Sequence, residues 1–280
     1  MNPYTMKLIA DSGSTSTVWY LENKKKRSLF KTEGYNPYYF STDEVALSIA
    51  STLKGAFDFA AVCSINFYGA GCSNAQSSAV ISGALSTVFP QAEIALGDDL
   101  IAAARATAAY SSGICCILGT GSNSCVYDGQ KILHKIPSLG YILGDEGAGS
   151  QIGKALISSY FYQEMPSDLA TALSQFYSMD KHQIISKLFN HKTPNRYLAS
   201  FVQFGVDHQQ HPYIRQLIQG CFDTFLRRHV LKYPESKHLP IHFVGSVAFG
   251  FKELLEQALK QHKLKIGRVL KSPFPALLDY

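Results

Sequence analysis

The sequence predicts an α/β protein built from two domains of related design. Apolar runs of strand length alternate with amphipathic helical segments through residues 7–110. A strand, a short polar turn and a second strand occur twice, first from residue 7 and again from residue 114. This repetition indicates an ancient duplication. It places a boundary near Gly113, between domains at residues 1–113 and 114–280.

The composition is that of a soluble globular enzyme. Of 280 residues, 46% are hydrophobic and 17% are charged, and the net charge is +5. The basic run Lys24-Lys25-Lys26-Arg27 is expected at the tip of a hairpin rather than at a nucleic-acid site. The N-terminus has no apolar core of signal-peptide length, and no later run approaches membrane-spanning length. We therefore expect a cytoplasmic protein without nucleic-acid or membrane partners.

The first half is expected to form a hairpin, followed by helices and strands in alternation. The helix that begins at Ser41 has the signature of a capping box, because Glu44 stands three residues later. The last helix of this half is rich in alanine and opens directly after Gly97-Asp98-Asp99. The expected strands are 7–10, 18–21, 59–65 and 92–96. Besides the helix that begins at Ser41, helices are expected at 73–88 and 100–110.

The second half repeats the hairpin and is then richer in helix. Residues 114–118 are a continuous apolar run, which is typical of a buried central strand. The other expected strands are 125–127, 241–244 and 268–270. The expected helices are 151–162, 169–177, 181–189, 196–204, 213–232 and 250–262, with a final helical turn at 276–280.

The cysteines point to packing and not to metal binding. The six of them show neither a Cys-x-x-Cys pair nor a histidine partner at zinc spacing. Free buried cysteines indicate a reducing compartment. The cysteines are Cys63, Cys72, Cys115, Cys116, Cys125 and Cys221.

Polar side chains gather where the predicted strands end. The turn 11–17 offers backbone N–H groups and hydroxyls beside one carboxylate, Asp11. Such a turn either stabilises itself through its Asp and Ser side chains, or it holds nucleotide phosphates while Asp11 holds a hydrated Mg²⁺. In the turn 119–123, Gly119 and Gly121 let the backbone approach an anion closely, although Gly-Thr-Gly after a strand is also an ordinary turn.

Two adjacent acids, Asp98 and Asp99, stand at the start of the alanine-rich helix. A helix N-terminus favours one acid as a cap. Because two are present, Asp98 can cap the helix while Asp99 stays available for another role. Ligands of open α/β sheets bind beyond the carboxyl ends of the strands, so we expect these turns to serve one site.

The ordered set of motifs resembles the actin-like ATPase fold shared by hexokinase, actin and the heat-shock chaperones. Within that fold it is most similar to the N-acetylglucosamine kinase branch of the BadF/BadG/BcrA/BcrD ATPase family. The resemblance implies two RNase H-like domains around a central cleft, with the last residues packing back on the N-terminal domain, and ATP and Mg²⁺ as cofactors. The matching pieces are Asp-Ser-Gly-Ser-Thr-Ser-Thr, Gly-Tyr-Asn-Pro, Asp-Asp-Leu-Ile-Ala-Ala, Gly-Thr-Gly-Ser-Asn, Gly-Asp-Glu-Gly-Ala-Gly and Phe-Val-Gly-Ser-Val, between residues 11 and 248.

The resemblance also implies a role for each motif. Asp99 matches the catalytic base, and Asp11 matches the acid that anchors Mg²⁺ through water. The positions that match phosphate contacts are Gly13, Ser14, Thr15, Gly119, Thr120 and Gly121. The positions that match sugar contacts are Asn36, Ser122, Asn123 and Asp145. Asp145 has an alternative role, as the cap of the following helix.

The adenosine motif of the family matches Gly245, Ser246 and Ala248, where a small residue lets the nucleoside lie against the backbone. An ordinary strand-to-helix turn is the alternative interpretation. Lys252, in the helix beyond, either contacts phosphate or ribose or is a solvated surface lysine.

The chain departs from the family at Leu139, where animal members carry a tryptophan before the Gly-Asp-Glu segment. Tyr141 is the residue that could supply an aromatic platform instead. This departure leaves N-acetylglucosamine, glucosamine and N-acetylmuramic acid open as substrates.

The implied activity is ATP-dependent phosphorylation of a small-molecule amino sugar, foremost N-acetylglucosamine to its 6-phosphate, by a monomer or a homodimer. One alternative is an ATPase that activates a partner dehydratase through an iron–sulfur cluster, although the cysteines offer no obvious ligand pair. The other is a non-catalytic sugar sensor, which would need neither Asp11 nor Asp99. The chain also lacks the helix-turn-helix segment and the cysteine-rich zinc motif of related repressors.

Overall fold

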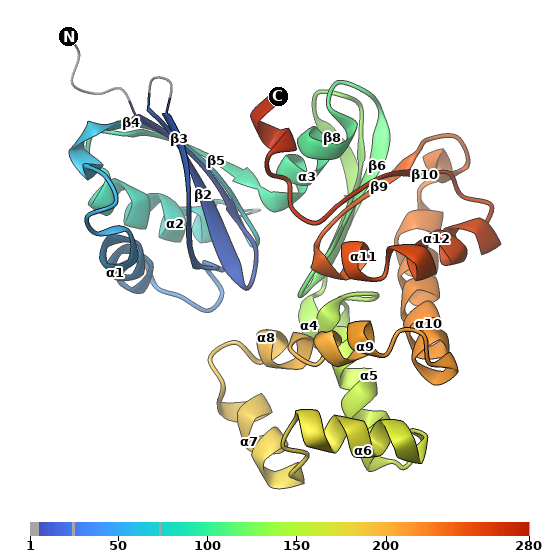
Figure 1. The fold of residues 1–280 in the computed structure, drawn as a ribbon. Helices are drawn as coiled ribbons and strands as arrows, with labels where there is room; N and C mark the ends of the chain where they lie inside the picture. The colour runs from blue at the N-terminus through green and yellow to red at the C-terminus, as the bar shows by residue number, and fades with distance from the viewer. Residues whose placement is uncertain (1–5, 24–25, 73, 280) are drawn as a thin grey trace. The chain divides into compact units, whose positions relative to one another are not determined.

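The computed structural model of the chain describes residues 6–23, 26–72 and 74–279 (Figure 1). The chain divides into two compact units, Met1–Ala102 and Ala103–Tyr280. The division falls inside helix α3 (Asp99–Ala108), upstream of the boundary that the repeat indicates near Gly113. Each unit contains one sheet and one hydrophobic core.

The first unit contains a five-stranded mixed sheet with the strand order β3-β2-β1-β4-β5. β1 and β2 form the predicted hairpin, and β3 pairs antiparallel with β2. β4 is parallel to β1 and β5 is parallel to β4, so the carboxyl ends of these three strands lie along one edge of the sheet. The strands are β1 (Met6–Ser12), β2 (Ser16–Asn23), β3 (Lys26–Glu33), β4 (Val62–Gly69) and β5 (Glu93–Asp98).

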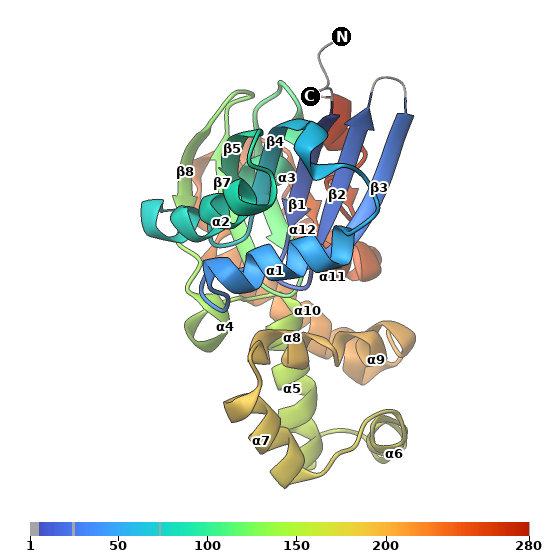
Figure 2. The same cartoon turned by 90° about the vertical axis from the view of Figure 1, so that its left-hand side faces the viewer.

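Helices α1 (Thr42–Leu53) and α2 (Ala75–Val88) cover one face of this sheet (Figures 1 and 2). The predicted capping box at the start of α1 is confirmed. Ser41 Oγ accepts a hydrogen bond from the Glu44 N–H, and the Glu44 carboxylate accepts one from the Ser41 N–H. In the core, the fully buried Trp19 packs against the rings of Phe67 and Phe89.

The second unit repeats the same plan. Its sheet has the order β10-β9-β6-β7-β8. β6, β7 and β8 are antiparallel neighbours, whereas β9 is parallel to β6 and β10 to β9. β6 therefore corresponds to β1, and the turn after β6 corresponds to the turn after β1, which supports the predicted duplication. The strands are β6 (Gly113–Leu118), β7 (Ser122–Tyr127), β8 (Ile132–Ile136), β9 (Ile241–Val244) and β10 (Ile266–Leu270).

Helices α10 and α12 pack on each other and share one core with β6 and β9. The segment from α5 to α9 forms a helical layer beside one end of this sheet (Figure 1). The helices are α4 (Gly140–Leu143), α5 (Gly149–Phe161), α6 (Ser167–Phe176), α7 (Lys181–Asn190), α8 (Pro194–Ala199), α9 (Val202–Asp207), α10 (Pro212–Arg228), α11 (Ser246–Gly250) and α12 (Lys252–Gln261). Short 3₁₀ turns occupy Phe59–Ala61, Val230–Lys232, Pro234–Lys237 and Ala276–Asp279.

Four predicted elements differ from the structure. The helix predicted at 213–232 ends at Arg228 and is followed by a 3₁₀ turn at Val230–Lys232. The strand predicted at 59–65 begins only at Val62, because the Asp58 side chain accepts the Ala60 N–H and caps a 3₁₀ turn. The helix predicted at 196–204 is broken into α8 and α9, and the Ser200 carbonyl between them accepts a hydrogen bond from the Tyr177 hydroxyl at 2.6 Å. The helix predicted at 250–262 is preceded by the separate short helix α11.

Some predicted positions fall outside the described residues, namely Lys24 and Lys25 at the hairpin tip, Ser73 before α2, and Tyr280. Within residues 6–23, 26–72 and 74–279, no helix combines the length and the apolar character that crossing a membrane requires.

Candidate functional site

In the first unit, the turn between β1 and β2 is short and internally bonded. Ser12 and Thr17 pair within the strands, and their side-chain oxygens lie 2.7 Å apart. Gly13 N–H donates to the Ser16 carbonyl at 3.1 Å. The loop proper is therefore residues 13–15, narrower than the predicted turn. Thr15 at its tip is exposed.

Three carboxylates lie at the same edge of the first sheet. Asp11 is near the end of β1, and Asp98 and Asp99 lie where β5 passes into α3, with only β4 between the two strands. The Asp98 carboxylate accepts the Leu100 N–H at 3.0 Å, so the prediction that Asp98 caps this helix is confirmed. Asp99 itself is the first residue of α3.

The pKa values of these acids are shifted upward. Burial, a hydrogen bond with Asp98, and the charges of Asp98 and Asp11 raise the pKa of Asp99 well above its ordinary value. Burial also raises the pKa of Asp11 to about 7. The proposed base and the proposed metal anchor thus interact electrostatically within one unit. A carboxylate with a raised pKa is a stronger proton acceptor once it is ionised.

Asn36 organises the loop that follows β3. Its side-chain oxygen accepts the Tyr38 N–H at 3.0 Å, and its carbonyl accepts the Tyr39 N–H at 2.9 Å. The adjacent Tyr35 is buried, and its hydroxyl lies 3.0 Å from Ser48 Oγ, which anchors the loop on α1. The oxygen of the Asn36 side chain therefore holds the turn, and its amide N–H₂ is the part suited to donate to a ligand.

In the second unit, the turn between β6 and β7 is tied to the start of α5. Gly149 N–H donates to the Gly119 carbonyl at 2.8 Å, and Ser150 N–H donates to the Thr120 carbonyl at 3.0 Å. A Cβ atom at Gly119 would meet no heavy atom within 4 Å, so open space adjoins the backbone there. A Cβ at Gly121 would lie 2.9 Å from Asp145 Oδ1. The turn is thus fixed on one side and open on the other, as a phosphate cradle needs to be.

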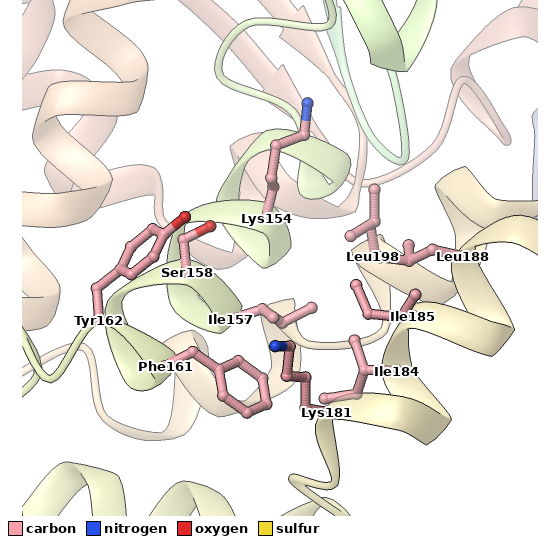
Figure 3. Close-up of a pocket in the computed structure, with 10 residues that line it drawn as sticks. All are labelled: Lys154, Ile157, Ser158, Phe161, Tyr162, Lys181, Ile184, Ile185, Leu188 and Leu198. Carbon is pink, nitrogen blue, oxygen red and sulfur yellow. The ribbon is translucent and has the colours of Figure 1, made fainter.

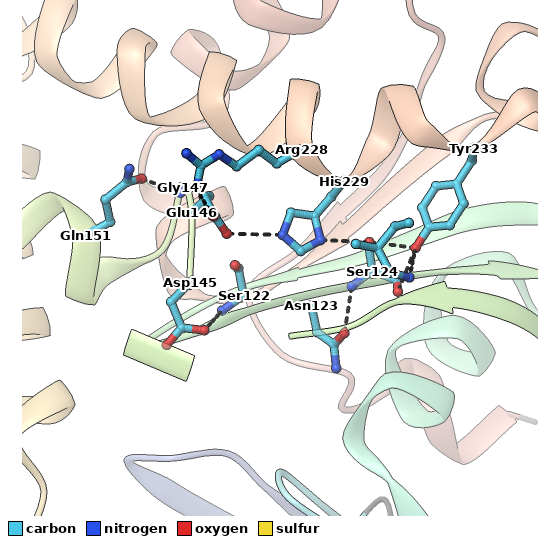
Figure 4. Close-up of polar contacts among 11 residues, drawn as sticks. Ser122, Asn123, Ser124, Asp145, Glu146, Gly147, Gln151, Arg228, His229 and Tyr233 are labelled. Atoms are coloured by element: carbon cyan, nitrogen blue, oxygen red, sulfur yellow. Dashed lines mark hydrogen bonds and ion pairs between the residues drawn. The ribbon is translucent and has the colours of Figure 1, made fainter. Parts of the chain in front are cut away.

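Asp145 belongs to this turn and not to the helix that follows it. Its carboxylate accepts the Ser122 N–H at 3.0 Å (Figure 4). The N-cap of α5 is Ala148, which makes no side-chain capping bond, so the alternative that Asp145 caps the helix is wrong. Asp145 adopts a left-handed φ of 58°, which turns it back toward β7. Burial raises its pKa to about 6, and the Glu146 charge adds to this while the Ser122 N–H opposes it.

The neighbours of Asp145 on β7 complete this half of the site. The Ser122 hydroxyl is buried and has no hydrogen-bond partner among the described residues. The Asn123 side-chain oxygen accepts the Ser124 N–H at 2.9 Å, which leaves its amide N–H₂ as a donor.

The turn after β9 lies against the same glycine turn. Gly245 has φ 133°, and a Cβ there would collide with the Leu118 carbonyl just before Gly119. Ser246 is exposed, whereas Ala248 is fully buried in the core. The structure therefore brings together the predicted second phosphate turn and the predicted adenosine turn in one unit.

Other sequence candidates have ordinary structural roles. Lys252 is exposed and pairs with Glu256 at 3.7 Å on the same helix, as the surface-lysine interpretation requires. Tyr141 packs against the core, and its carbonyl accepts a hydrogen bond from Lys154 Nζ at 3.1 Å. Leu139 is 58% exposed, so an apolar side chain stands where the animal proteins have tryptophan.

The sequence reasoning missed a polar network behind Asp145 (Figure 4). The Glu146 carboxylate accepts a hydrogen bond from Arg228 at 2.7 Å and lies 3.2 Å from His229 Nε2. His229 Nδ1 lies 3.3 Å from Ser124 Oγ, which in turn lies 2.8 Å from the Tyr233 hydroxyl. We call these five residues the Glu146 network. The adjacent acids Asp145 and Glu146, flanked by two glycines, were the available signal, but the partners of Glu146 lie more than 80 residues away along the chain.

A separate pocket of about 430 Å³ lies in the helical layer of the second unit, between α5, α7 and α8 (Figure 3). None of the predicted site residues lines it. Its lining is mostly apolar, with two lysines, and comprises Lys154, Ile157, Ser158, Phe161, Tyr162, Lys181, Ile184, Ile185, Leu188 and Leu198. In the described part of the chain, no group of three or more His, Cys, Asp or Glu side chains is placed to hold a metal ion.

No family model and no curated protein matches the sequence. Among solved structures, the chain is similar to a candidate N-acetylglucosamine kinase from Porphyromonas gingivalis. The two share 39% identity and superpose with a TM-score of 0.91, over 98% of this chain and 97% of that one.

More distant structures share the fold. A candidate N-acetylglucosamine kinase from Chromobacterium violaceum has 17% identity and a TM-score of 0.73, over 99% of each chain. A ROK-family glucokinase from Streptomyces griseus, solved with glucose and AMPPNP, has 14% identity and a TM-score of 0.54, over 98% of each chain. Since the Porphyromonas gingivalis match extends over nearly the whole of both chains, this chain belongs to the same family, and it is an ATP-dependent sugar kinase with the actin-like ATPase fold.

Proposed function

We propose that this protein transfers the γ-phosphoryl group of ATP to the 6-hydroxyl of N-acetylglucosamine. The observation that carries the choice of sugar is the full-length likeness, at 39% identity, to a candidate N-acetylglucosamine kinase. Within this proposal the chain is a member of the N-acetylglucosamine kinase branch of the BadF/BadG/BcrA/BcrD family. Glucosamine and N-acetylmuramic acid are the competing acceptors.

Asp99 is the proposed general base. The sugar hydroxyl oxygen attacks the γ-phosphorus, its proton passes to the Asp99 carboxylate, and the bond to the β-phosphate oxygen breaks to release ADP. The position of Asp99 at the start of α3, directly after β5, with a pKa raised by burial, Asp98 and Asp11, supports this role. Because Asp98 already caps α3, the helix does not need Asp99 for that purpose.

The glycine turns are the proposed phosphate sites. The open backbone at Gly119 can approach an anion, and the Gly245 turn packed against Leu118 is suited to the nucleoside. Gly13, Ser14 and Thr15 are further proposed phosphate contacts. Bound Mg²⁺ would neutralise charge on the polyphosphate, and the carboxylate of Asp11 would hold it through water.

The proposed sugar contacts come from polar groups that the fold leaves available. The amide N–H₂ groups of Asn36 and Asn123 are donors, since their oxygens are already bonded within loops. The Asp145 carboxylate has acceptor capacity beyond its one bond to the Ser122 N–H. The buried Ser122 hydroxyl can serve as donor or acceptor.

The test is an initial-rate comparison of N-acetylglucosamine, glucosamine and N-acetylmuramic acid with ATP and Mg²⁺, in which the sugar phosphate is detected by mass spectrometry. We expect N-acetylglucosamine to have the highest kcat/KM. Preferential phosphorylation of another amino sugar would contradict the choice of acceptor, and ATP hydrolysis without any sugar phosphate would contradict the proposed reaction.

A further inference from the structure

The Asp145-Glu146 pair holds strand β7 at two alternate residues. Asp145 accepts the Ser122 N–H directly, and Glu146 reaches the Ser124 hydroxyl through His229. The second glycine turn ends where this strand begins.

The ionised state of Glu146 is well supported by its partners. Its side chain is 9% exposed, and burial would raise its pKa, but the hydrogen bonds from Arg228, from a backbone N–H and from His229 together lower it. Arg228 and His229 stand at the C-terminal end of α10, where the helix dipole favours positive charge. Glu146 is thus fastened to the end of a long helix.

Hydrogen-bond chemistry decides which groups donate and which accept in the Glu146 network. A carboxylate only accepts, so His229 Nε2 carries a proton toward Glu146. In the neutral imidazole, Nδ1 then accepts the Ser124 hydroxyl proton. The Tyr233 hydroxyl donates to the Ser124 carbonyl at 3.0 Å and accepts the Ile136 N–H at 2.8 Å. These contacts connect the network to the backbone of β7 at Ser124 and to the backbone of β8 at Ile136.

We propose that Glu146, clamped by Arg228 and His229, is the positioning residue that keeps the Asp145 carboxylate on the Ser122 amide and thereby sets the affinity for the sugar. The positioning is argued from the geometry alone, whereas the effect on sugar affinity rests on the proposed function. Without the clamp, the Asp145–Gly147 segment would lose its attachment to α10, and Asp145 would lose its fixed place beside Gly121.

The first test measures amide hydrogen exchange at Ser122 and needs no substrate. Glu146→Gln and Arg228→Gln should each speed exchange of the Ser122 N–H by about tenfold, because its bond to Asp145 opens more often. Arg227→Gln is the matched control, since Arg227 pairs with Asp223 at 2.7 Å on the same helix and lies outside the network. Exchange of the Ile114 N–H in β6, which donates to the Pro240 carbonyl at 3.0 Å, should stay unchanged in all three variants.

Equal acceleration at Ser122 and Ile114 would indicate general destabilisation and would overturn the proposal, as would unchanged exchange at Ser122. Arg228→Gln keeps the test valid if Glu146→Gln does not fold, because the Arg228 side chain is 64% exposed.

The second test is a double-mutant cycle on the sugar KM with Glu146→Gln and Asp145→Asn. Glu146→Gln alone should raise the sugar KM by about tenfold with kcat within about threefold. In the Asp145→Asn background it should add little, because Glu146 acts through Asp145. Additive effects would refute the link between the two residues. If the wild-type protein phosphorylates no sugar, the proposed function fails, and the exchange experiment still decides the positioning.

Discussion

The carboxylate of Asp145 accepts the backbone N–H of Ser122 at 3.0 Å, and this one bond joins the Gly-Asp-Glu-Gly segment to the second glycine turn. A residue that sequence reasoning could assign either to a sugar site or to a helix cap thus lies beside the phosphate turn. Asp145 is only 7% exposed, so its ionisation is coupled to both folding and binding.

Sugar affinity should depend on pH through Asp145. Its pKa is raised to about 6, and the ionised carboxylate is the better hydrogen-bond acceptor for sugar hydroxyls. We therefore expect the sugar KM to fall as the pH rises through about 6 and then to level off. Steady-state kinetics from about pH 5 to about pH 8 measures this. The inflection should vanish in Asp145→Asn, and an identical inflection in that variant would rule Asp145 out as its source.

The raised pKa of Asp145 also predicts that the folded protein becomes less stable as the pH rises, although sugar binding improves. Because the folded-state pKa of about 6 exceeds the ordinary value of 3.8, Asp145 destabilises the fold as the pH rises between these values. At 1.4 kcal/mol per unit, the full cost above about pH 6 is about 3 kcal/mol. Asp145→Asn should therefore raise Tm at about pH 8 and leave it nearly unchanged at about pH 4, as differential scanning calorimetry would show. A variant that is destabilised equally at both pH values would contradict the assignment.

Asp99→Asn should lower kcat for sugar phosphorylation by about 10²–10⁴-fold, since the amide cannot accept the hydroxyl proton. The affinity for ATP, measured by calorimetric titration, should stay close to that of the wild type. Asp98→Asn is the matched neighbour, because asparagine preserves the helix cap. It removes a negative charge that raises the Asp99 pKa, so the acidic limb of the pH–kcat profile should move to lower pH. Near-normal turnover by Asp99→Asn would show that another group is the base.

Two glycines of one turn should respond differently to alanine. At Gly119 a Cβ meets no atom within 4 Å, so Gly119→Ala should leave Tm unchanged while raising the KM for ATP by about tenfold. At Gly121 a Cβ would meet the Asp145 carboxylate, so Gly121→Ala should chiefly raise the sugar KM. Thermal denaturation and two-substrate kinetics distinguish the cases. Equal effects of both substitutions on the KM values for ATP and sugar would contradict separate roles.

Substitutions at Asn36 can test the side-chain oxygen and the amide N–H₂ group separately. Asn36→Asp keeps the oxygen that accepts the Tyr38 N–H but loses the N–H₂ donor, whereas Asn36→Ala loses both. If the amide donates to the sugar, Asn36→Asp should raise the sugar KM by about tenfold with little change in Tm. A normal KM in Asn36→Asp, together with a raised KM in Asn36→Ala, would assign Asn36 to loop structure alone.

The sequence predicted the parts of the fold that have a local cause. The capping box at Ser41 and Glu44, the cap at Asp98 and the two hairpins depend on residues a few positions apart. At the break between α8 and α9, the Ser200 carbonyl accepts a hydrogen bond from the hydroxyl of Tyr177, which lies more than 20 residues earlier, just beyond α6. The short strand β8 escaped prediction because Ile132–Ile136 contains exposed polar residues between its isoleucines.

In the candidate site, too, features with a local sequence pattern could be predicted and contacts between distant residues could not. Glycines and acids at strand ends are visible in the sequence, and the structure places Gly119 against Gly245 within one unit and Asp11 near Asp99 within the other. The partner of Asp145 could not be predicted, because a short side chain at φ 58° turns away from the helix that follows it. The Glu146 network joins residues far apart in sequence, and no local pattern encodes it.

The most direct test of the central claim is the product formed by the purified protein from ATP, Mg²⁺ and N-acetylglucosamine, followed by phosphorus NMR. The account predicts one N-acetylglucosamine 6-phosphate for each ADP released, and loss of this product in Asp99→Asn. Release of inorganic phosphate in place of a sugar phosphate would contradict it.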